Sequence, residues 1–525
     1  MNTGGGGTTT HGPTTGGVTT HGPTTGGATN MNTGGGGTTT HGPTTGGATM
    51  QTHGPTTGGT TMHGPTTGGA TMQTHGPTTG GATTHGPTTG GAATHGPTTG
   101  GSMEVTSHTT GGGASHGPSG GGASHGPTAG GGRTATGGIA PKGSNTRVTK
   151  NGGAITTRSN GKIRDVHDPK RGIDVHHGLN GNRRISVERP DHSRIYGERG
   201  RPGYVQRGYG YHGHDFARRT YFYHGRAYSH FYHGYNYRGV DLNVYAPGFY
   251  YHPGFYGWAY HPWAMPIAFA WGWGGNPWYN YYGYYFAPYQ VYPSAAYWLT
   301  DYLISSDLQA AYAAQQDAGE VDGAPPAAGG PPELTPDVKQ QIADEVRDQL
   351  ALENSEAQQN AQGQDVDPGS SGIARMLGDG RPHVLVVGSA LDVVDSSGAE
   401  CALSDGDVLS LRTEPPADAT AADLIVLASK GGQECPRSDT VSVSLDDMQE
   451  MLNSMRATID QGLQELQAKQ GTGGLPALPP AAQGQPAPAP YTAVAPPPDP
   501  NVGTEIQQQT QQADQAEGDA AQTGP

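Results

Sequence analysis

The aromatic side chains of this 525-residue chain are confined to one stretch. All six Trp, all seven Phe and 23 of the 26 Tyr lie between Tyr204 and Tyr302, and residues 1–195 contain none of these three types. Aromatic side chains bury more apolar area than any others. We therefore expect ordered structure to be concentrated in this stretch and in a small C-terminal domain that lacks aromatic rings.

Composition and charge divide the chain further. The 90 Gly and 42 Pro make up about a quarter of the residues, a level typical of low-complexity sequence, so one large core is not expected. Residues 1–132 carry one acid and no Lys or Arg, residues 133–241 hold 20 basic and 8 acidic side chains, and residues 242–525 hold 9 and 35. A basic middle and an acidic C-terminal half should attract each other, within one molecule or between molecules.

Residues 1–132 form a tandem repeat. The unit His-Gly-Pro-Thr-Thr-Gly-Gly begins at His11, His21, His41, His53, His63, His75, His85 and His95. Few apolar side chains are present to offset the entropy of ordering, and Pro and Gly disfavour helix and sheet, so we expect a disordered, flexible arm. Its His residues are candidate metal ligands, but their wide spacing would make each ion close a long loop.

Residues 133–244 predict a basic β-hairpin meander held together by aromatic and Arg stacking. One hairpin gives a testable register. If Leu179-Asn180-Gly181 is a three-residue loop, Ile173 faces Val187 and Val175 faces Ile185, whereas a two-residue turn would place Val175 opposite Ser186. A turn at His224-Gly225 would likewise set Tyr221 against Tyr228.

The same region supports three functional interpretations. Arg, Gly and Tyr interleave around Arg207-Gly208-Tyr209, as in segments that bind RNA or single strands. Aromatic and Arg-rich faces also suit a polysaccharide or another envelope polymer. Finally, a folded meander could gather a set of metal ligands. The candidate ligands for a divalent transition metal are His212, His214, Asp215, His224 and His233.

Residues 245–300 are uncharged, aromatic and rich in Gly and Pro. Seven prolines leave no interval near the roughly 20 residues that a spanning helix needs, so we predict no transmembrane segment. We expect instead a sticky surface that contacts a polymer, a membrane interface or another copy of the chain.

Helices and a small β domain are expected beyond this stretch. Residues 301–360 should form acidic helices and a linker, with Thr335 as the N-cap of a helix whose apolar stripe is narrow. Residues 373–470 predict a small, barrel-like β domain with five strands, at residues 383–387, 391–394, 408–411, 424–427 and 441–445, followed by a helix capped by Ser444. Residues 471–525, rich in Pro, Ala and Gln, should be a disordered tail.

Both cysteines, Cys401 and Cys435, fall inside this β domain, and we predict that they form a disulfide. A disulfide requires an oxidising compartment, which favours an extracellular or cell-envelope location over the cytoplasm. No signal peptide follows Met1, but the seventeen residues from Met1 recur unchanged from Met31, which leaves the true start open.

No motif with catalytic spacing stands out. Gly117-Pro118-Ser119-Gly120-Gly121 has the Gly-x-Ser-x-Gly form, but it lies in the repeat, where Gly is so frequent that chance explains the match. We predict neither an enzyme nor a bound cofactor.

Three short motifs carry a resemblance. They are Arg158-Ser159-Asn160-Gly161, Arg164-Asp165-Val166-His167 and Tyr211-His212-Gly213-His214. With the Gln-rich helix after Thr335, they resemble uncharacterised bacterial proteins that are exported or envelope-associated. The resemblance covers about residues 150–480 and implies no activity, ligand or functional residue.

These observations favour a non-enzymatic, modular surface, envelope or matrix protein. Its basic aromatic middle would adhere to a polymer such as polysaccharide or to another copy of the chain. A metal-sequestering protein is the alternative, and a polyanion or nucleic-acid binder is the third interpretation.

Overall fold

The computed structural model describes residues 140–149, 152–318, 333–431 and 434–522, and, between residues 9 and 116, the backbone of short strands. The chain divides into two compact units, Met1–Pro127 and Thr128–Pro525. The predicted domains from residue 133 onward therefore belong to a single unit.

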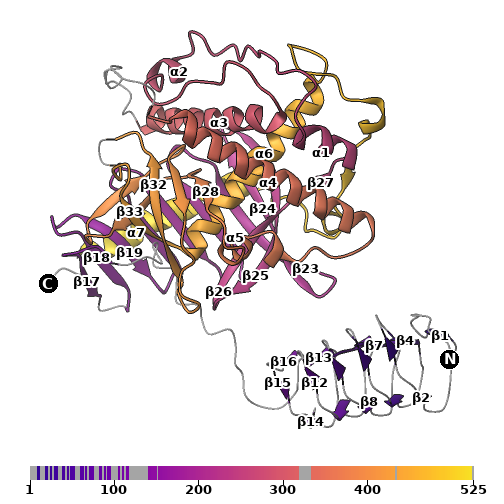
Figure 1. Cartoon of the computed structure of the whole chain (residues 1–525). Helices are drawn as coiled ribbons and strands as arrows, with labels where there is room; N and C mark the ends of the chain where they lie inside the picture. Colours follow the sequence, from indigo (N-terminus) through magenta and orange to yellow (C-terminus); the bar gives the residue numbers. More distant parts are fainter. Residues whose placement is uncertain are drawn as a thin grey trace. The chain divides into compact units, whose positions relative to one another are not determined.

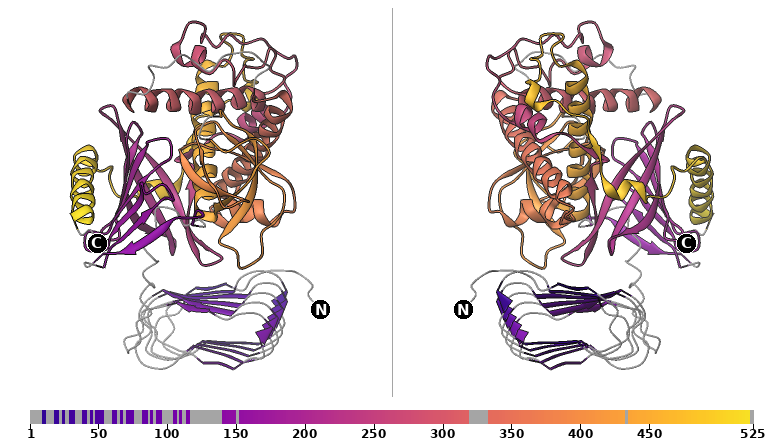
Figure 2. Two further views of the ribbon diagram at one scale, coloured as in Figure 1. Left: turned by 90° about the vertical axis from the view of Figure 1, so that its left-hand side faces the viewer. Right: turned by 90° about the vertical axis from the view of Figure 1, so that its right-hand side faces the viewer.

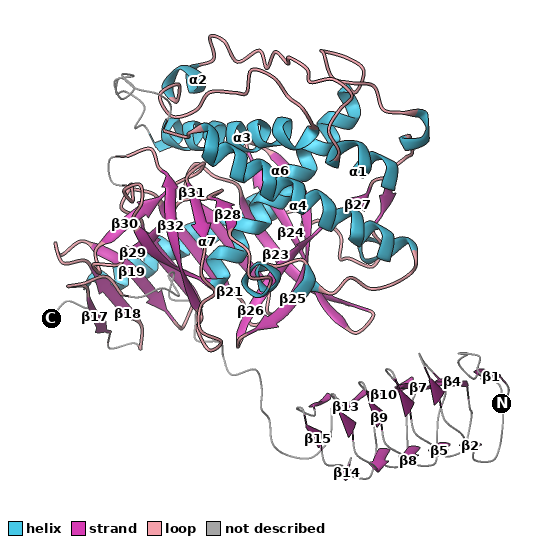
Figure 3. Cartoon of the chain, in the orientation of Figure 1, coloured by secondary structure: helices cyan, strands magenta, loops and turns pink. Residues whose placement is uncertain are grey.

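The strands of the first unit pair in parallel, so that copies of the repeat lie side by side: His21 pairs with His41, and His41 with His63 (Figure 3). Three sheets result. The first contains β1 (Thr9–His11), β4 (Thr29–Asn32), β7 (Ala48–His53), β10 (Ala70–His75), β13 (Ala92–His95) and β16 (Ala114–His116). The second contains β14 (Glu104–Thr106), β11 (Ala82–His85), β8 (Thr60–His63), β5 (Thr38–His41) and β2 (Val18–His21). The third contains β15 (Thr109–Thr110), β12 (Thr88–Thr89), β9 (Thr66–Thr67), β6 (Thr44–Thr45) and β3 (Thr24–Thr25).

The expectation that this repeat would form neither helix nor sheet is wrong for these segments. Parallel pairing in register satisfies the backbone groups of identical segments without requiring a large apolar core. The rest of the predicted flexible arm lies outside the described residues.

The second unit is built on a ten-stranded antiparallel meander in which every strand pairs with its neighbour in sequence (Figure 1). The strands are β17 (Asn145–Val148), β18 (Ala154–Thr157), β19 (Ile163–Asp168), β20 (Ile173–His177), β21 (Arg183–Glu188), β22 (Arg194–Glu198), β23 (Gly203–Tyr211), β24 (His214–Tyr223), β25 (Arg226–Tyr237) and β26 (Val240–Ala246). The predicted meander is confirmed.

Both registers predicted from the sequence are confirmed. Ile173 pairs with Val187 and Val175 with Ile185, across a loop in which Gly181 has a φ of 78°. Such a positive φ is costly for a residue with a Cβ, which explains the glycine at this position.

The predicted stacking of rings and guanidinium groups is also present. Tyr221 faces Tyr228, with ring centroids 5.1 Å apart and planes 8° from parallel. The guanidinium of Arg219 lies 4.0 Å from the ring centroid of Tyr232.

Alternation of side chains gives the meander two different faces. The apolar face carries a row of buried β-branched residues: Ile155, Val166, Ile173, Val175, Ile185, Val187, Ile195 and Val205. It is covered by helix α7 (Val502–Gln522), which lies along the strands from β19 to β24 (Figure 2).

The prediction of a disordered tail after residue 471 is therefore wrong for its described part. Before α7, this segment contains η2 (Pro480–Ala482), β34 (Ala487–Pro488) and η3 (Pro490–Ala493), and β34 pairs with β27 (Phe249–Tyr250). Its composition suggested disorder because the few apolar residues stand far apart, but Val502 and Tyr491 are buried against the rest of the unit.

The opposite, charged face of the meander is held by ion pairs with the acidic C-terminal half. Arg158 contacts Asp392 at 2.8 Å and Glu400 at 2.7 Å, and Arg164 also contacts Glu400 at 2.5 Å. His176 lies between Asp165 and Asp392. The expected attraction between basic and acidic segments thus operates within one molecule.

Most of the aromatic rings after the meander are internal, so the predicted sticky surface over residues 245–300 is wrong. Tyr256, Tyr285, Phe286 and Tyr292 are all at most 1% exposed, and they pack with helices in the largest hydrophobic cluster of the unit. The sequence could not distinguish an adhesive surface from a core, because both are apolar and aromatic.

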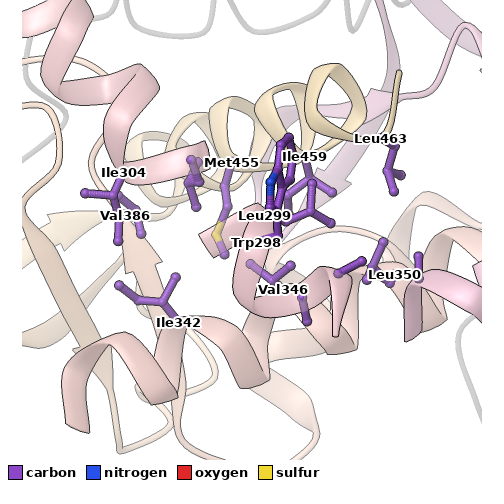
Figure 4. Packing of buried hydrophobic residues seen from close by; sticks show 14 of the residues in the cluster. Trp298, Leu299, Ile304, Ile342, Val346, Leu350, Val386, Met455, Ile459 and Leu463 are labelled. Carbon is purple, nitrogen blue, oxygen red and sulfur yellow. The ribbon is translucent and has the colours of Figure 1, made fainter. Parts of the chain in front are cut away.

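Four helices form the centre of this cluster: α1 (Pro253–Tyr260), α3 (Ala295–Ala318), α4 (Pro336–Ala361) and α6 (Leu445–Lys469). Figure 4 shows Trp298 of α3, Val346 of α4 and Ile459 of α6 meeting in this core. A short helix, α2 (Pro277–Tyr281), precedes α3.

Both predicted helix caps are confirmed. The Thr335 hydroxyl accepts a hydrogen bond from the backbone N–H of Val338 at the start of α4. The Ser444 hydroxyl accepts one from the N–H of Asp447 at the start of α6.

A second, six-stranded sheet has the order β28-β31-β32-β33-β29-β30. Its strands are β28 (His383–Val386), β29 (Leu391–Asp395), β30 (Glu400–Leu403), β31 (Val408–Leu411), β32 (Ala421–Ala428) and β33 (Thr440–Ser444), and η1 (Pro368–Ser370) and α5 (Ile373–Gly378) precede them. Five strands were predicted; β30 was missed because its four residues, Glu-Cys-Ala-Leu, carry little β propensity.

The expected barrel-like closure does not occur among the described residues, because the terminal strands β28 and β30 are not paired with each other. The predicted disulfide between Cys401 and Cys435 is present and joins β30 to the loop before β33. None of the helices in the described ranges combines the length and apolar composition needed to cross a membrane.

Candidate ligand pocket

A pocket of about 90 Å³ opens beside the tip of the β23–β24 hairpin. The wall formed by the meander carries Tyr211, His212, His214, Phe216, His233, Val244, Tyr245 and Ala246. The rest of the lining consists of Pro247 and Tyr250, which follow the meander directly, and of residues from segments far away in sequence: Glu356, Asn360, Gly363, Gln364, Asp365, Val366, Pro368, Ser371, Pro490 and Tyr491.

The wall of the pocket is a stack of rings. Phe216 lies between His233, at a centroid distance of 4.3 Å, and Tyr491, at 4.8 Å. Tyr211 approaches Phe216 edge to face at 5.9 Å. Strand pairing positions this stack, because Phe216 is directly opposite His233 in the β24–β25 register.

His233 contributes a neutral polar atom to this wall. The residue is 5% exposed, and among the described residues its Nε2 atom has no hydrogen-bond partner. Burial, with a smaller effect of the neighbouring His214, lowers the pKa of His233 to about 4. The ring is therefore uncharged at neutral pH and can donate or accept one hydrogen bond.

The charged groups of the pocket are partnered. Glu356 is 2% exposed, and its two carboxylate oxygens accept hydrogen bonds from Nη2 of Arg456, at 2.8 and 3.0 Å, and from the hydroxyl of Ser371 at 2.6 Å. At the rim, Nδ1 of His212 lies 2.9 Å from the Asp365 carboxylate. These pairings leave rings and neutral polar groups as the main surface offered to a ligand.

The pocket brings together three of the five predicted metal ligands. His214 and His233 lie with ring centroids 5.2 Å apart, and His212 occupies the adjacent turn. Asp215 does not join them. Successive side chains of β24 point to opposite faces of the sheet, and Asp215 lies next to Gly234. His224 is in the turn at the opposite end of β24, 3.9 Å from Asp317.

The structure thus brings only three of the five candidate ligands together. Within the part of the chain that the structure describes, no three His, Cys, Asp or Glu side chains are placed to hold a metal ion. The five residues do not meet, because the full length of a strand separates His212 from His224.

No pattern in the sequence indicated that residues from distant segments would line the pocket. Glu356, Asp365 and Tyr491 lie in a helix, a loop and a tail, and nothing local links them to the hairpin. Only Tyr491 carried a signal, since it is the one aromatic residue in the otherwise ring-free C-terminal segment.

Comparison of the chain with protein-family models, curated proteins and solved structures finds no match. The function must therefore be argued from the pocket and from the charges of the unit that contains it.

Proposed function

We propose that this protein is a non-enzymatic, modular protein of the bacterial surface, envelope or matrix that holds a polysaccharide through a sugar ring bound in the pocket. The observation that supports it best is the stack of His233, Phe216 and Tyr491 beside a concave surface. Ring faces suit the apolar faces of sugars, and neutral polar groups at the edge suit their hydroxyls.

The neutral character of the pocket favours an uncharged sugar. Glu356 is neutralised by Arg456, and His233 is uncharged at neutral pH because of its lowered pKa. Asn360 and Gln364 add amide groups, each of which can both donate and accept hydrogen bonds.

The charge distribution argues against a polyanion as the main ligand. Basic side chains of the meander, including Arg158, Arg164, Arg201 and Arg219, contact acids of the same chain. Beyond residue 132 the chain holds 29 basic and 43 acidic side chains, so its net charge repels a polyanion.

The proposal is tested by calorimetric titration of the full chain with neutral and acidic oligosaccharides. We expect saturable binding of a neutral oligosaccharide that changes little with salt. Tyr211→Ala should weaken binding about tenfold, since ring stacking contributes about 0.5–1.5 kcal/mol and about 1.4 kcal/mol corresponds to a tenfold change in affinity. Tyr237→Ala, which removes a partly buried ring outside the pocket, is the matched control.

Equal binding by Tyr211→Ala and Tyr237→Ala, or binding that salt abolishes, would contradict the proposal. Zinc, copper and nickel titrations test the metal-sequestering alternative, which rests on the proximity of His214 and His233. Stoichiometric metal binding that is lost in His214→Ala would favour it. Fractionation of the native cell separates an envelope location from a cytoplasmic one.

A further inference from the structure

Helix α7 packs on the apolar face of the meander as a separate outer layer. The helix is the last described element of the chain and lies on the side of the meander away from the six-stranded sheet (Figure 2). Its buried apolar residues are small: Val502, Ala513, Ala516 and Ala520. Without it, a row of Ile and Val side chains would be exposed to water.

The surfaces of the helix and the sheet are closely complementary in shape. Ile506 sits over two glycines on adjacent strands: a Cβ on Gly197 would lie 3.2 Å, and one on Gly203 3.0 Å, from its side chain. On the helix side, Gly503 is fitted against the ring of Phe222, where a Cβ would come within 2.7 Å. Close complementarity of this kind is expected of a specific docking site.

Charges on the two surfaces are complementary. The segment from Asp499 to Gln522 carries five acids and no basic residue. Arg189 contacts Glu505 at 2.7 Å, and Arg183 contacts Glu517 at 2.7 Å. Arg171 reaches Asp519 at 2.9 Å, and Glu517 also contacts His177.

The connection to the helix is short and is anchored on its near side. Asp499 pairs with Arg207 at 2.5 Å, and its backbone N–H donates to the Thr220 hydroxyl. Only Pro500 and Asn501 separate this anchor from the start of α7. A helix on the outside of the unit, joined by a short hinge, can be exchanged between identical chains.

We propose that the apolar face is a docking site that α7 of a second copy can fill, so that two copies exchange their terminal helices. The exchanged dimer makes every helix–sheet contact of the single chain, and the two forms differ in the hinge and in the cost of association. A second copy fits better than an unrelated helix, because it supplies Gly503, Ile506 and the acids in the positions that the sheet complements.

Reversed charges in the full-length chain test this directly. One variant carries Glu505→Arg and Glu517→Arg, and the other carries Arg183→Glu and Arg189→Glu. In either variant alone, α7 meets like charges both on its own sheet and on any identical copy. In a mixture, each helix is complementary only to the sheet of the other variant.

We expect light scattering to report a single-copy mass for each variant alone and a doubled mass for the equimolar mixture. Hydrogen exchange should show the α7 amides more strongly protected in the mixture than in the separate variants. Circular dichroism checks that both variants retain the meander.

The chain carrying all four substitutions is the matched control, because its helix and sheet are again complementary within one molecule. Its α7 should be protected, and its mass should match that of the unsubstituted chain. A mixture that keeps the single-copy mass and protects α7 no better than the separate variants do, while the fourfold variant protects it, would overturn the proposal. Because no oligosaccharide enters the assay, this result is independent of the proposed sugar binding.

Discussion

The two faces of the ten-stranded meander are covered in opposite ways. The apolar face, with residues such as Ile173 and Val187, is covered by one helix that buries mainly Ala. The charged face, with Arg158, Arg164 and His176, is covered by a second sheet through ion pairs. Strand alternation lets one sequence carry both surfaces, so neighbouring residues serve different kinds of contact.

Because the two faces are held by different forces, substitutions on them should lower the unfolding free energy by different amounts. Burial of apolar area tolerates small losses, whereas a buried ion pair becomes costly as soon as one partner is removed. The partly exposed ion pairs that flank α7 should matter least.

The largest effect is expected on the charged face. Glu400→Ala would leave Arg158 and Arg164 with one carboxylate fewer at a site where all three side chains are at most 8% exposed. Loss of one partner from a buried pair costs about 3–5 kcal/mol of unfolding free energy. Urea denaturation measures this loss. Glu465→Ala, which removes an i,i+4 partner of Lys469 at a half-exposed site, should cost less than about 1 kcal/mol.

The next effect is a pH dependence due to His233. Because the pKa of His233 is about 4 in the folded chain, against about 6.5 when unfolded, acid protonates the unfolded state first. Its contribution to stability is present above pH 6.5 and is lost as the pH falls toward 4, by as much as about 3 kcal/mol. Urea denaturation across this range measures the change in unfolding free energy. His233→Gln should flatten the slope, and an unchanged slope would contradict this assignment.

A smaller effect is expected from trimming the apolar face. Ile195 is fully buried beneath α7, and Ile195→Val removes one methylene. This change typically costs about 0.5–1.5 kcal/mol of unfolding free energy. Urea denaturation should show the loss without any dependence on salt. A cost as large as that of Glu400→Ala would break the proposed contrast between the faces.

The smallest effect is expected at the edge of α7. Glu517→Gln removes the ion pair with Arg183, at a site where both side chains are about one fifth exposed. We expect a loss of less than about 1 kcal/mol at low salt, shrinking as salt is raised. Thermal unfolding at two salt concentrations measures it. A loss that does not change with salt would indicate packing rather than charge.

Local patterns were enough to predict many elements. The Gly181 loop set the pairing of Ile173 with Val187, and the caps at Thr335 and Ser444 marked where two helices begin. Each of these features depends on residues close in sequence, whose turn and capping chemistry is the same in any fold.

The pocket was only half predictable. His212, His214 and His233 were identified from the sequence of the hairpins, but other lining residues, such as Glu356 and Tyr491, come from distant segments. The same limit explains the error on residues 245–300, since an uncharged aromatic stretch is apolar whether it faces another molecule or its own core.

By itself, the sequence determined the repeat, the order of hairpins, the helix starts and the charge division between the middle and the C-terminal half. Only the tertiary structure decided that the arginines are paired within the chain, that residues 502–522 form a helix on the apolar face, and that three of the five candidate metal ligands share a pocket. Turns and caps depend on a few adjacent residues, whereas burial and charge pairing depend on which distant segments meet.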